Sequence, residues 1–361
     1  MTLRIDISGL PPERLRFAAS PLAELTAMLH VLAEPGHHPQ FAEWAAEVWV
    51  GLGPELAERI RESEFLWRSS QADFLFPARP RPTLAEELDD VDGIDDETYV
   101  TAALVTTCGG NRAHFATPSP LTDPTARERA LDLAQARGAR QEAFAERLLA
   151  DPAAVRARVR HTLERCAEAF FHAAWTGVAV QLATDLRLKN DLLKRQGIAA
   201  ALASVSGAVT LAPDDDWIIV DKLQDKSTTA QGSGVTFIPS VFGSPHLVVV
   251  HTPGWQPVVQ YPVAERSTAE PVSLEAVTLR LDALGHPVRL RLLRTLARGP
   301  HTTGELAHTW ELSPPEVSRH LAVLRRAGLL TARRHGRYVR HALDLPALTA
   351  LGTDLLAAVL R

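Results

Sequence analysis

The feature that most constrains the fold of this 361-residue chain is the order of short apolar patterns in its last ninety residues. Side chains at helical spacing predict four consecutive helices there. Gly285 ends the first helix, His286-Pro287 begins the second, and Ser313-Pro314 begins the fourth with a cap and a first-turn proline. The predicted helices cover 274–284, the stretch from 287 to Gly299-Pro300, 303–310, and 314–327.

The segment after Gly328 predicts an arginine-rich hairpin. Two β-branched or apolar runs, 330–334 and 337–343, flank His335-Gly336, a suitable two-residue turn. Such a hairpin can press against a phosphate backbone or a minor groove. Its arginines are Arg333, Arg334, Arg337 and Arg340.

The fourth helix presents a polar face suited to a DNA groove. Val317, Leu321 and Leu324 predict its buried side, so that Pro315, Arg319 and Ala322 point away. An outward arginine can donate two hydrogen bonds to guanine, and a short serine lets the backbone approach a base edge. His320 lies beside the core edge, where packing or a phosphate contact competes with base contact. The candidate DNA-binding residues are Ser313, Pro315, Glu316, Ser318, Arg319, His320, Arg333, Arg334, Arg337 and Tyr338.

The charge of the chain is divided between its two parts. Residues 272–361 contain 13 Arg, no Lys and 7 acidic residues and therefore carry +6, whereas the remainder carries −11. A basic module on an acidic body predicts a polyanionic partner for the module alone. A last helix over 345–360 aligns Leu348, Leu351, Leu355 and Val359 on one side, which favours self-association.

These motifs together resemble the ArsR family of winged helix-turn-helix repressors. The resemblance lies in LDALGHPVRLRLLRTL, GELA, LSPPEVSRHLAVLRRAGLL and RRHGRYVRHAL, over about 274–361. It implies a homodimer held by the first and last helices of the module, bound to an inverted-repeat operator on double-stranded DNA. It also implies recognition by the 314–327 helix, with Ser318 and Arg319 at the base-reading positions.

The module departs from the metal sensors of that family. Those proteins carry paired cysteines in the third helix, or His and acidic ligands along the last one. Here the third helix reads GELAHTWEL and the last offers only Asp354, while Cys108 and Cys166 lie outside the module. Metal sensing by either familiar site is therefore not expected, and neither a metal nor another cofactor is predicted.

The preceding residues predict a mainly α body. Helix-forming composition dominates 123–204, and a strand is expected over 2–8. The Pro- and Asp-rich stretch 77–97 is expected to be a loop or a poorly ordered surface segment. Short β-branched runs between 208 and 261 predict a small antiparallel sheet. The expected domains are a sensor or dimerisation domain over 1–263, with its β-rich part at about 206–263, a linker over 264–272, and the winged helix over 273–361.

The body shows no recognised catalytic or metal-binding pattern. Its eight histidines have no ligand spacing, and His37 and His38, being adjacent, are not expected to converge on one ion. Cys108 is interpreted as structural. Segments of the body resemble an uncharacterised domain fused to ArsR-type modules in actinobacterial regulators; they are ERLRFAASPLAELTAMLHVL, FIPSVFGSPH and GWQPVVQYPVA.

The sequence therefore predicts a sequence-specific, dimeric DNA-binding transcription regulator, a repressor, whose body responds to an unknown effector. No secretion signal or membrane span is recognised and cysteine is scarce, so a cytoplasmic location is expected, without contact to a membrane. Two alternatives stay open. The body can be an enzyme that also controls its own gene, or a platform for dimerisation or protein docking.

Overall fold

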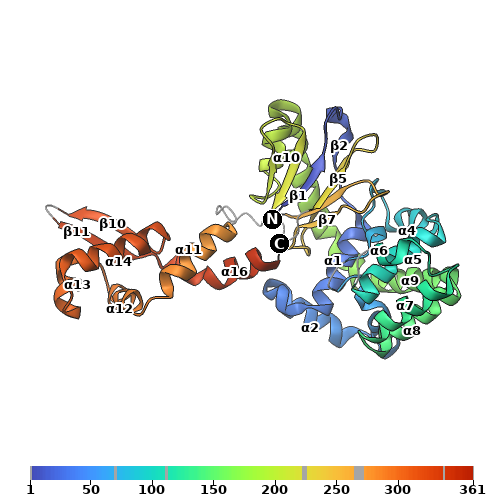
Figure 1. Ribbon diagram of the computed structural model, residues 1–361, viewed down its shortest axis with the longest axis horizontal. Helices are drawn as coiled ribbons and strands as arrows, with labels where there is room; N and C mark the ends of the chain where they lie inside the picture. Colours follow the sequence, from blue (N-terminus) through green and yellow to red (C-terminus); the bar gives the residue numbers. More distant parts are fainter. Residues whose placement is uncertain are drawn as a thin grey trace. The chain divides into compact units, whose positions relative to one another are not determined.

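The computed structural model describes residues 2–68, 71–109, 113–221, 226–263, 272–335 and 338–360. The chain divides into two compact units, Met1–Ser267 and Thr268–Arg361, with separate apolar cores (Figure 1). The division falls within the stretch predicted as a linker, of which the structure describes only Val272.

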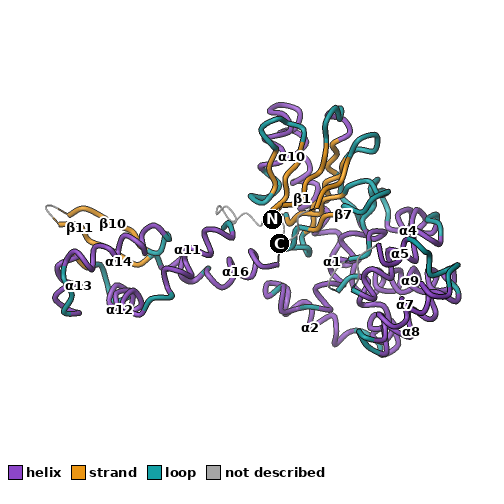
Figure 2. Tube along the Cα trace, viewed as in Figure 1, coloured by secondary structure: helices purple, strands orange, loops and turns teal. Residues whose placement is uncertain are grey.

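The N-terminal unit is mainly helical, as predicted, and several of its helices begin at caps visible in the sequence (Figure 2). Helix α1 (Pro21–Ala33) begins after Ser20, whose hydroxyl accepts a hydrogen bond from the Ala23 amide at 3.0 Å. Helices α7 (Pro124–Gln135) and α9 (Pro152–Cys166) begin in the same way after an aspartate. The other helices are α2 (Ala42–Gly51), α3 (Pro54–Ser63), α4 (Leu84–Asp92), α5 (Asp96–Cys108), α6 (Ala113–Ala116), α8 (Ala139–Ala150) and α10 (His172–Ala203).

Short helical turns connect these elements. Five are 3₁₀ turns, and η6 (Ala167–Phe171) is a π-helical turn that joins α9 to α10. The 3₁₀ turns are η1 (Pro12–Arg14), η2 (Pro35–His37), η3 (Pro39–Phe41), η4 (Glu64–Leu66) and η5 (Asp73–Leu75). Among the described residues, no helix joins the length and the apolar character that a membrane crossing requires.

The prediction for 77–97 is wrong in its central part, because residues 77–83 are irregular but Leu84–Asp92 form helix α4. Helix α4 begins with a capping box in which the Thr83 hydroxyl accepts from the Glu86 amide at 3.3 Å and the Glu86 carboxylate accepts from the Thr83 amide at 3.1 Å. Leu84 and Leu88 are buried one turn apart. The acidic composition concealed a start signal, a threonine followed three residues later by glutamate.

Two four-stranded sheets replace the single antiparallel sheet that was predicted. In the first, β1 (Thr2–Asp6) pairs antiparallel with β4 (Trp217–Asp221) and parallel with β5 (Lys226–Thr229), while β3 (Val209–Leu211) pairs antiparallel with β4. The strand order is β3-β4-β1-β5. A strand's alternation shows which side chains face a core but leaves its partner open, and β1 finds partners more than two hundred residues away.

The second sheet is also mixed, with the order β2-β6-β8-β7. Strand β6 (Val235–Ser240) lies between β2 (Leu15–Phe17) and β8 (Val258–Pro262) and is parallel to both, whereas β7 (Val248–Val250) is antiparallel to β8. All six side chains of β6 are buried. A strand buried on both faces is typical of parallel pairing.

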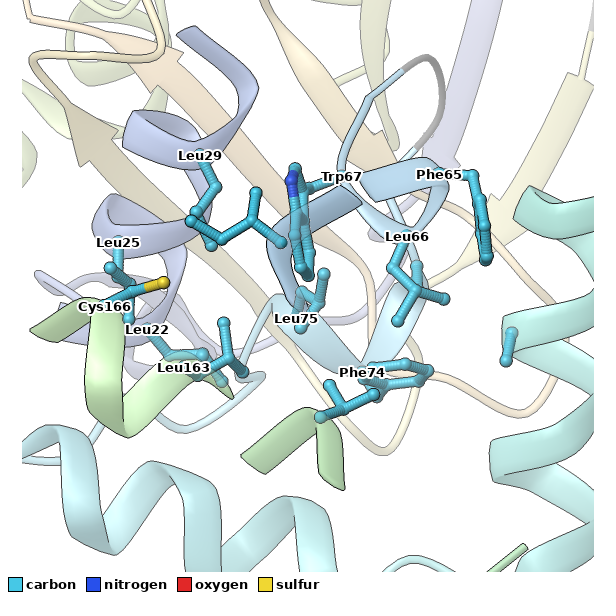
Figure 3. Packing of buried hydrophobic residues seen from close by; sticks show 14 of the residues in the cluster. Leu22, Leu25, Leu29, Phe65, Leu66, Trp67, Phe74, Leu75, Leu163 and Cys166 are labelled. Carbon is cyan, nitrogen blue, oxygen red and sulfur yellow. The ribbon is translucent and has the colours of Figure 1, made fainter. Parts of the chain in front are cut away.

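The main core of the N-terminal unit surrounds α1. Every residue from Pro21 to Leu32 is buried, so that α1 is a central helix covered on all sides. Figure 3 shows three leucines of this helix packed towards the segments that carry η4 and η5 and towards α9. The labelled residues are Leu22, Leu25, Leu29, Phe65, Leu66, Trp67, Phe74, Leu75, Leu163 and Cys166.

The C-terminal unit has the predicted order of helices. The bounds of α11 (Leu274–Leu284) and α13 (Thr303–Trp310) agree with the prediction, and α12 (Pro287–Leu296) and α14 (Pro314–Arg326) begin after the predicted caps His286 and Ser313. The last helix is divided into α15 (Leu345–Thr349) and α16 (Leu351–Leu360).

A three-stranded sheet completes this unit, in the order β10-β11-β9. Strands β10 (Leu330–His335) and β11 (Tyr338–Leu343) pair antiparallel, and the short β9 (His301–Thr302) pairs with β11. His335 is paired with Tyr338 and therefore belongs to strand β10, although it was predicted to lie in the turn. Gly336 and Arg337 lie outside the described residues.

Candidate DNA-binding interface

A tight turn joins α13 to α14 and sets the position of α14. Glu311 ends α13 in the left-handed conformation, with φ 52° and ψ 40°. The Ser313 hydroxyl then caps α14 by accepting from the Glu316 amide at 3.4 Å. Val317, Leu321 and Leu324 are buried in the core of the unit, as predicted. One face of α14 is thereby held inward and the opposite face is left to solvent.

The outer face of α14 carries the predicted base-reading residues. Ser313, Pro315, Ser318 and Arg319 are exposed, and Glu316 is half-buried. Within the described parts of the chain, Arg319 has no hydrogen-bond or ion-pair partner. Its guanidinium therefore keeps five N–H donors available to a ligand.

His320 lies at the edge of this face rather than on it. Its half-buried ring packs against the His286 ring, with centroids 4.8 Å apart. Burial lowers the pKa of His320, and the neighbouring His286 lowers it further. This placement favours the packing role over direct base contact.

The hairpin brings like charges together. Arg333 and Arg340 are directly opposed across β10 and β11, and both are exposed. Like charges directly opposite on a sheet repel, and an anion between them relieves that repulsion. Arg334, opposite Val339, is exposed as well. Arg337 and the side chain of Tyr338 lie outside the described residues.

Other arginines of the unit are engaged in its structure. Arg280 of α11 is paired with Asp354 of α16 at 2.6 Å. The Arg289 guanidinium donates to the Ala283 and Asp282 carbonyls at 2.6 and 2.8 Å and so caps the end of α11. Asp354, the acidic side chain noted in the last helix, is therefore the partner of a cation.

The N-terminal unit contains a histidine cluster that the sequence reasoning missed. His30 lies in the last turn of α1, His37 is the last residue of η2, His38 follows it, and His246 lies between β6 and β7. Ring centroids are 5.0 Å apart for His30 and His38, and 4.8 and 5.6 Å from His246 to His30 and His37. Both rings neighbour His30 and His246, but only His37 joins those two residues in a group whose ligating atoms lie within 4.8 Å of one another, so the expectation that His37 and His38 do not converge on one ion stays a prediction.

Only part of this cluster had a signal in the sequence. His30, His37 and His38 are spaced by seven and one, which brings the rings together only because the chain turns at Pro35 and Gly36. His246 comes from more than two hundred residues away. No local spacing rule links it to the others.

The two cysteines are structural, in agreement with the sequence interpretation of Cys108. Both thiols are buried and free. Burial raises the pKa of each to about 12, so that the reactive thiolate is disfavoured.

Comparisons with known proteins divide the chain at the same place as its fold. A family model described as a family of unknown function (DUF5937) matches residues 1–267, and a helix-turn-helix domain model matches 284–333. The biofilm growth-associated repressor of Agrobacterium fabrum is 33% identical over 96 residues, which are 26% of this chain and 77% of that protein. The HTH-type transcriptional regulator Rv2034 of Mycobacterium tuberculosis is 42% identical over 74 residues, 20% of this chain and 69% of its own.

A crystal structure of an ArsR family transcriptional regulator is 30% identical to this chain, covers 22% of it and 84% of its own length, and has a TM-score of 0.21. The family model spans most of the chain, and the regulators above are similar to its C-terminal unit. The chain therefore belongs to the family of unknown function (DUF5937), and its C-terminal unit makes it a DNA-binding transcriptional regulator of the ArsR type.

Proposed function

We propose that this protein represses transcription by binding an inverted-repeat operator as a homodimer, with α14 in the major groove. The observation that carries the proposal is the outer face of α14. Buried Val317, Leu321 and Leu324 fix the helix, and Arg319 projects from it without a partner among the described residues. The similarity to repressors of known name supports the direction of regulation.

Sequence reading is assigned to Ser318 and Arg319. Arginine pairs with guanine O6 and N7 through two hydrogen bonds, and each good pair discriminates by about 1–3 kcal/mol. Ser313 and Pro315 lie at the exposed start of α14, and we assign this helix terminus to a contact with a DNA phosphate. Glu316 lies beside them and is assigned to restricting which bases the operator can have at that position.

The hairpin arginines are assigned to the DNA backbone. Arg333 and Arg340 repel each other in the free protein, and a phosphate between them removes that repulsion. Arg334 adds a third exposed cation on the same hairpin. These contacts position the protein without reading sequence. Arg337 and Tyr338, predicted from the sequence for the same role, remain part of the proposal.

Dimerisation is assigned to the first and last helices of the unit. Large apolar side chains are left exposed there, including Leu279 at 47% and Val359 at 55%. A two-fold arrangement covers such a surface with its own copy. Two recognition helices then enter successive major grooves about 34–36 Å apart.

Effector response is assigned to the N-terminal unit. In the C-terminal unit, Asp354 is occupied by Arg280 and the sequence contains no cysteine, so the metal sites of the related sensors are not reproduced. A ligand of the N-terminal unit would act by binding more tightly to one of two DNA-binding states.

Operator selection with the full-length protein tests the proposal. Wild-type protein should enrich a short palindrome, and Arg319→Ala should lose about 1–3 kcal/mol of affinity and relax specificity at one base per half-site. Arg298→Ala is the matched control, because it removes an exposed arginine of the same unit outside α14 and the hairpin. If no sequence is enriched at moderate salt, or if both variants lose affinity equally, α14 is not a base reader.

A further inference from the structure

We propose that the N-terminal unit binds one divalent transition-metal ion, of the Zn²⁺ class, through the imidazoles of His30, His37 and His246. The site concerns this unit alone and is independent of operator binding. It differs from the metal sites of the ArsR-type sensors, which lie in the winged-helix unit.

Three separate segments hold the imidazoles. His30 is fixed in the last turn of the buried helix α1 and is 6% exposed. His37 is half-buried in η2, directly after the turn that ends α1, and His246 is half-buried between β6 and β7. One ligating atom from each of these three residues lies within 4.8 Å of the other two. Convergence from a helix, a turn and a strand connection is typical of a site formed by tertiary structure.

The distances suit an ion of this size. His30 Nε2 and His246 Nε2 are 3.1 Å apart. Around a tetrahedral zinc ion with Zn–N bonds of about 2.0–2.1 Å, two ligating nitrogens lie about 3.3–3.4 Å from each other. A shift of a few tenths of an ångström therefore converts this contact into a pair of ligands.

Backbone carbonyls select the correct tautomer of two rings. His30 Nδ1 lies 3.0 Å from the Trp67 carbonyl, and His38 Nδ1 lies 2.6 Å from the Ser244 carbonyl. Because a carbonyl only accepts, each Nδ1 carries the proton and each Nε2 keeps its lone pair. Metal-bound histidines are oriented by this same second contact.

Two buried nitrogens of the cluster lack a partner. Among the described residues, His37 Nδ1 and His38 Nε2 are inaccessible to solvent and make no hydrogen bond. His38 as a whole is 0% exposed. An unsatisfied buried polar atom costs about 1–3 kcal/mol, so such atoms require an explanation. An ion bound by His30, His37 and His246 supplies one for the buried nitrogen of His37.

The ligand type defines the class of ion. The nearest carboxylate that affects His30, that of Glu34, is bound to Arg68 at 2.5 Å. A site built from imidazoles selects zinc, cobalt, nickel or copper and discriminates against calcium and magnesium, which require oxygen ligands. The expected partner is therefore a borderline transition metal.

The test uses the untagged full-length protein, stripped with a chelator and then titrated with Co²⁺ and with Zn²⁺. Wild-type protein should bind one equivalent of Co²⁺ and develop visible d–d absorption, which Zn²⁺ should abolish by displacement. Zn²⁺ should also raise the Tm of the unit, because it binds only the folded state.

His37→Ala and His246→Ala each remove one half-buried ligand and leave the central helix intact. Each should weaken Zn²⁺ binding at least about a hundredfold, since loss of an outer-shell partner alone costs 10–100-fold. His161→Ala, an exposed histidine of α9 outside the cluster, is the matched control and should bind like wild type.

The Tm of each variant without metal verifies that it is folded, and the two variants provide independent tests. Absence of a one-equivalent cobalt complex in wild-type protein would overturn the proposal. So would Zn²⁺ affinity that is equal in wild type, His37→Ala and His246→Ala, because the ion would then bind elsewhere.

Discussion

The two units of this protein differ in what they bury and what they expose. Every fully buried polar or charged side chain among the described residues lies in the N-terminal unit, including Glu24, Glu87 and Lys189. The C-terminal unit has about a third as many residues, yet it holds seven of the ten large apolar side chains that are exposed in the described parts of the chain. The N-terminal unit therefore buries polar groups in its core, whereas the C-terminal unit exposes apolar side chains on its surface.

This difference follows from size and task. A unit of fewer than a hundred residues buries a smaller share of its surface, and α11 and α16 keep large apolar side chains exposed, which is the surface proposed for dimerisation. The larger unit surrounds α1 completely and can afford buried polar groups that fix one arrangement of its segments.

The largest difference between the two units should appear when one core leucine in each unit is replaced by alanine. Leu29→Ala and Leu324→Ala each remove a fully buried leucine, one from each unit, and should cost about 2–5 kcal/mol of unfolding free energy. Calorimetry should show two transitions, with each variant lowering only its own. A single transition that both variants lower equally would mean that the units unfold as one.

A charged residue introduced at an exposed apolar position should weaken dimerisation only when that position lies in the C-terminal unit. Leu279→Glu places a carboxylate on α11 and should weaken a dimer by roughly 3 kcal/mol, about a hundredfold, since a buried charge would be left unpaired. Val180→Glu, at a still more exposed position of α10, should leave assembly unchanged. Sedimentation at several concentrations distinguishes the two, and monomeric wild-type protein would contradict the proposed dimer.

The buried carboxyl of Glu24 should make the N-terminal unit less stable at higher pH. Burial raises the pKa of Glu24 to about 7, although the Val241 and Phe242 amides donate to its carboxylate. Between the unfolded value near 4.5 and about 7, the folded state retains a proton that the unfolded state has lost. Stability attributable to this group therefore falls by about 3 kcal/mol as the pH rises through that window.

Glu24→Gln should remove this part of the pH dependence, whereas Glu47→Gln, at an exposed position of α2, should not. Denaturant unfolding at pH 5 and pH 8 measures the difference. Parallel pH profiles for wild type and Glu24→Gln would show that the carboxyl is already ionised in the folded state.

The smallest effect is expected at the hairpin. Arg333→Ala should weaken binding to all DNA sequences by a similar factor and reduce the slope of log affinity against log salt by about one. Filter binding at 50–200 mM salt measures that slope. A loss confined to one operator sequence would instead make Arg333 a base reader.

The local elements of the C-terminal unit were predictable because their signals are local. Helices end at Gly285 and begin after His286 and Ser313. Each of these signals acts within four residues, because a capping side chain satisfies a free backbone N–H group and a first-turn proline has none. Val317, Leu321 and Leu324 recur at helical spacing, so the outward position of Arg319 followed from them. The bounds of α11 and α13 and the cap of α14 therefore agree with the prediction.

Only the tertiary structure decided the features that join segments far apart in the sequence, namely the pairing of strands and the histidine cluster. β1 pairs with β4 and β5 across more than two hundred residues, and alternation within a strand contains no information about its partner. The histidine cluster has the same origin, because His246 reaches His30 only after β6 and α1 have packed together. The sequence by itself determined the helix that is proposed to read DNA, because its pattern lies within one element, whereas only tertiary structure could bring together the histidine cluster, whose residues come from three segments.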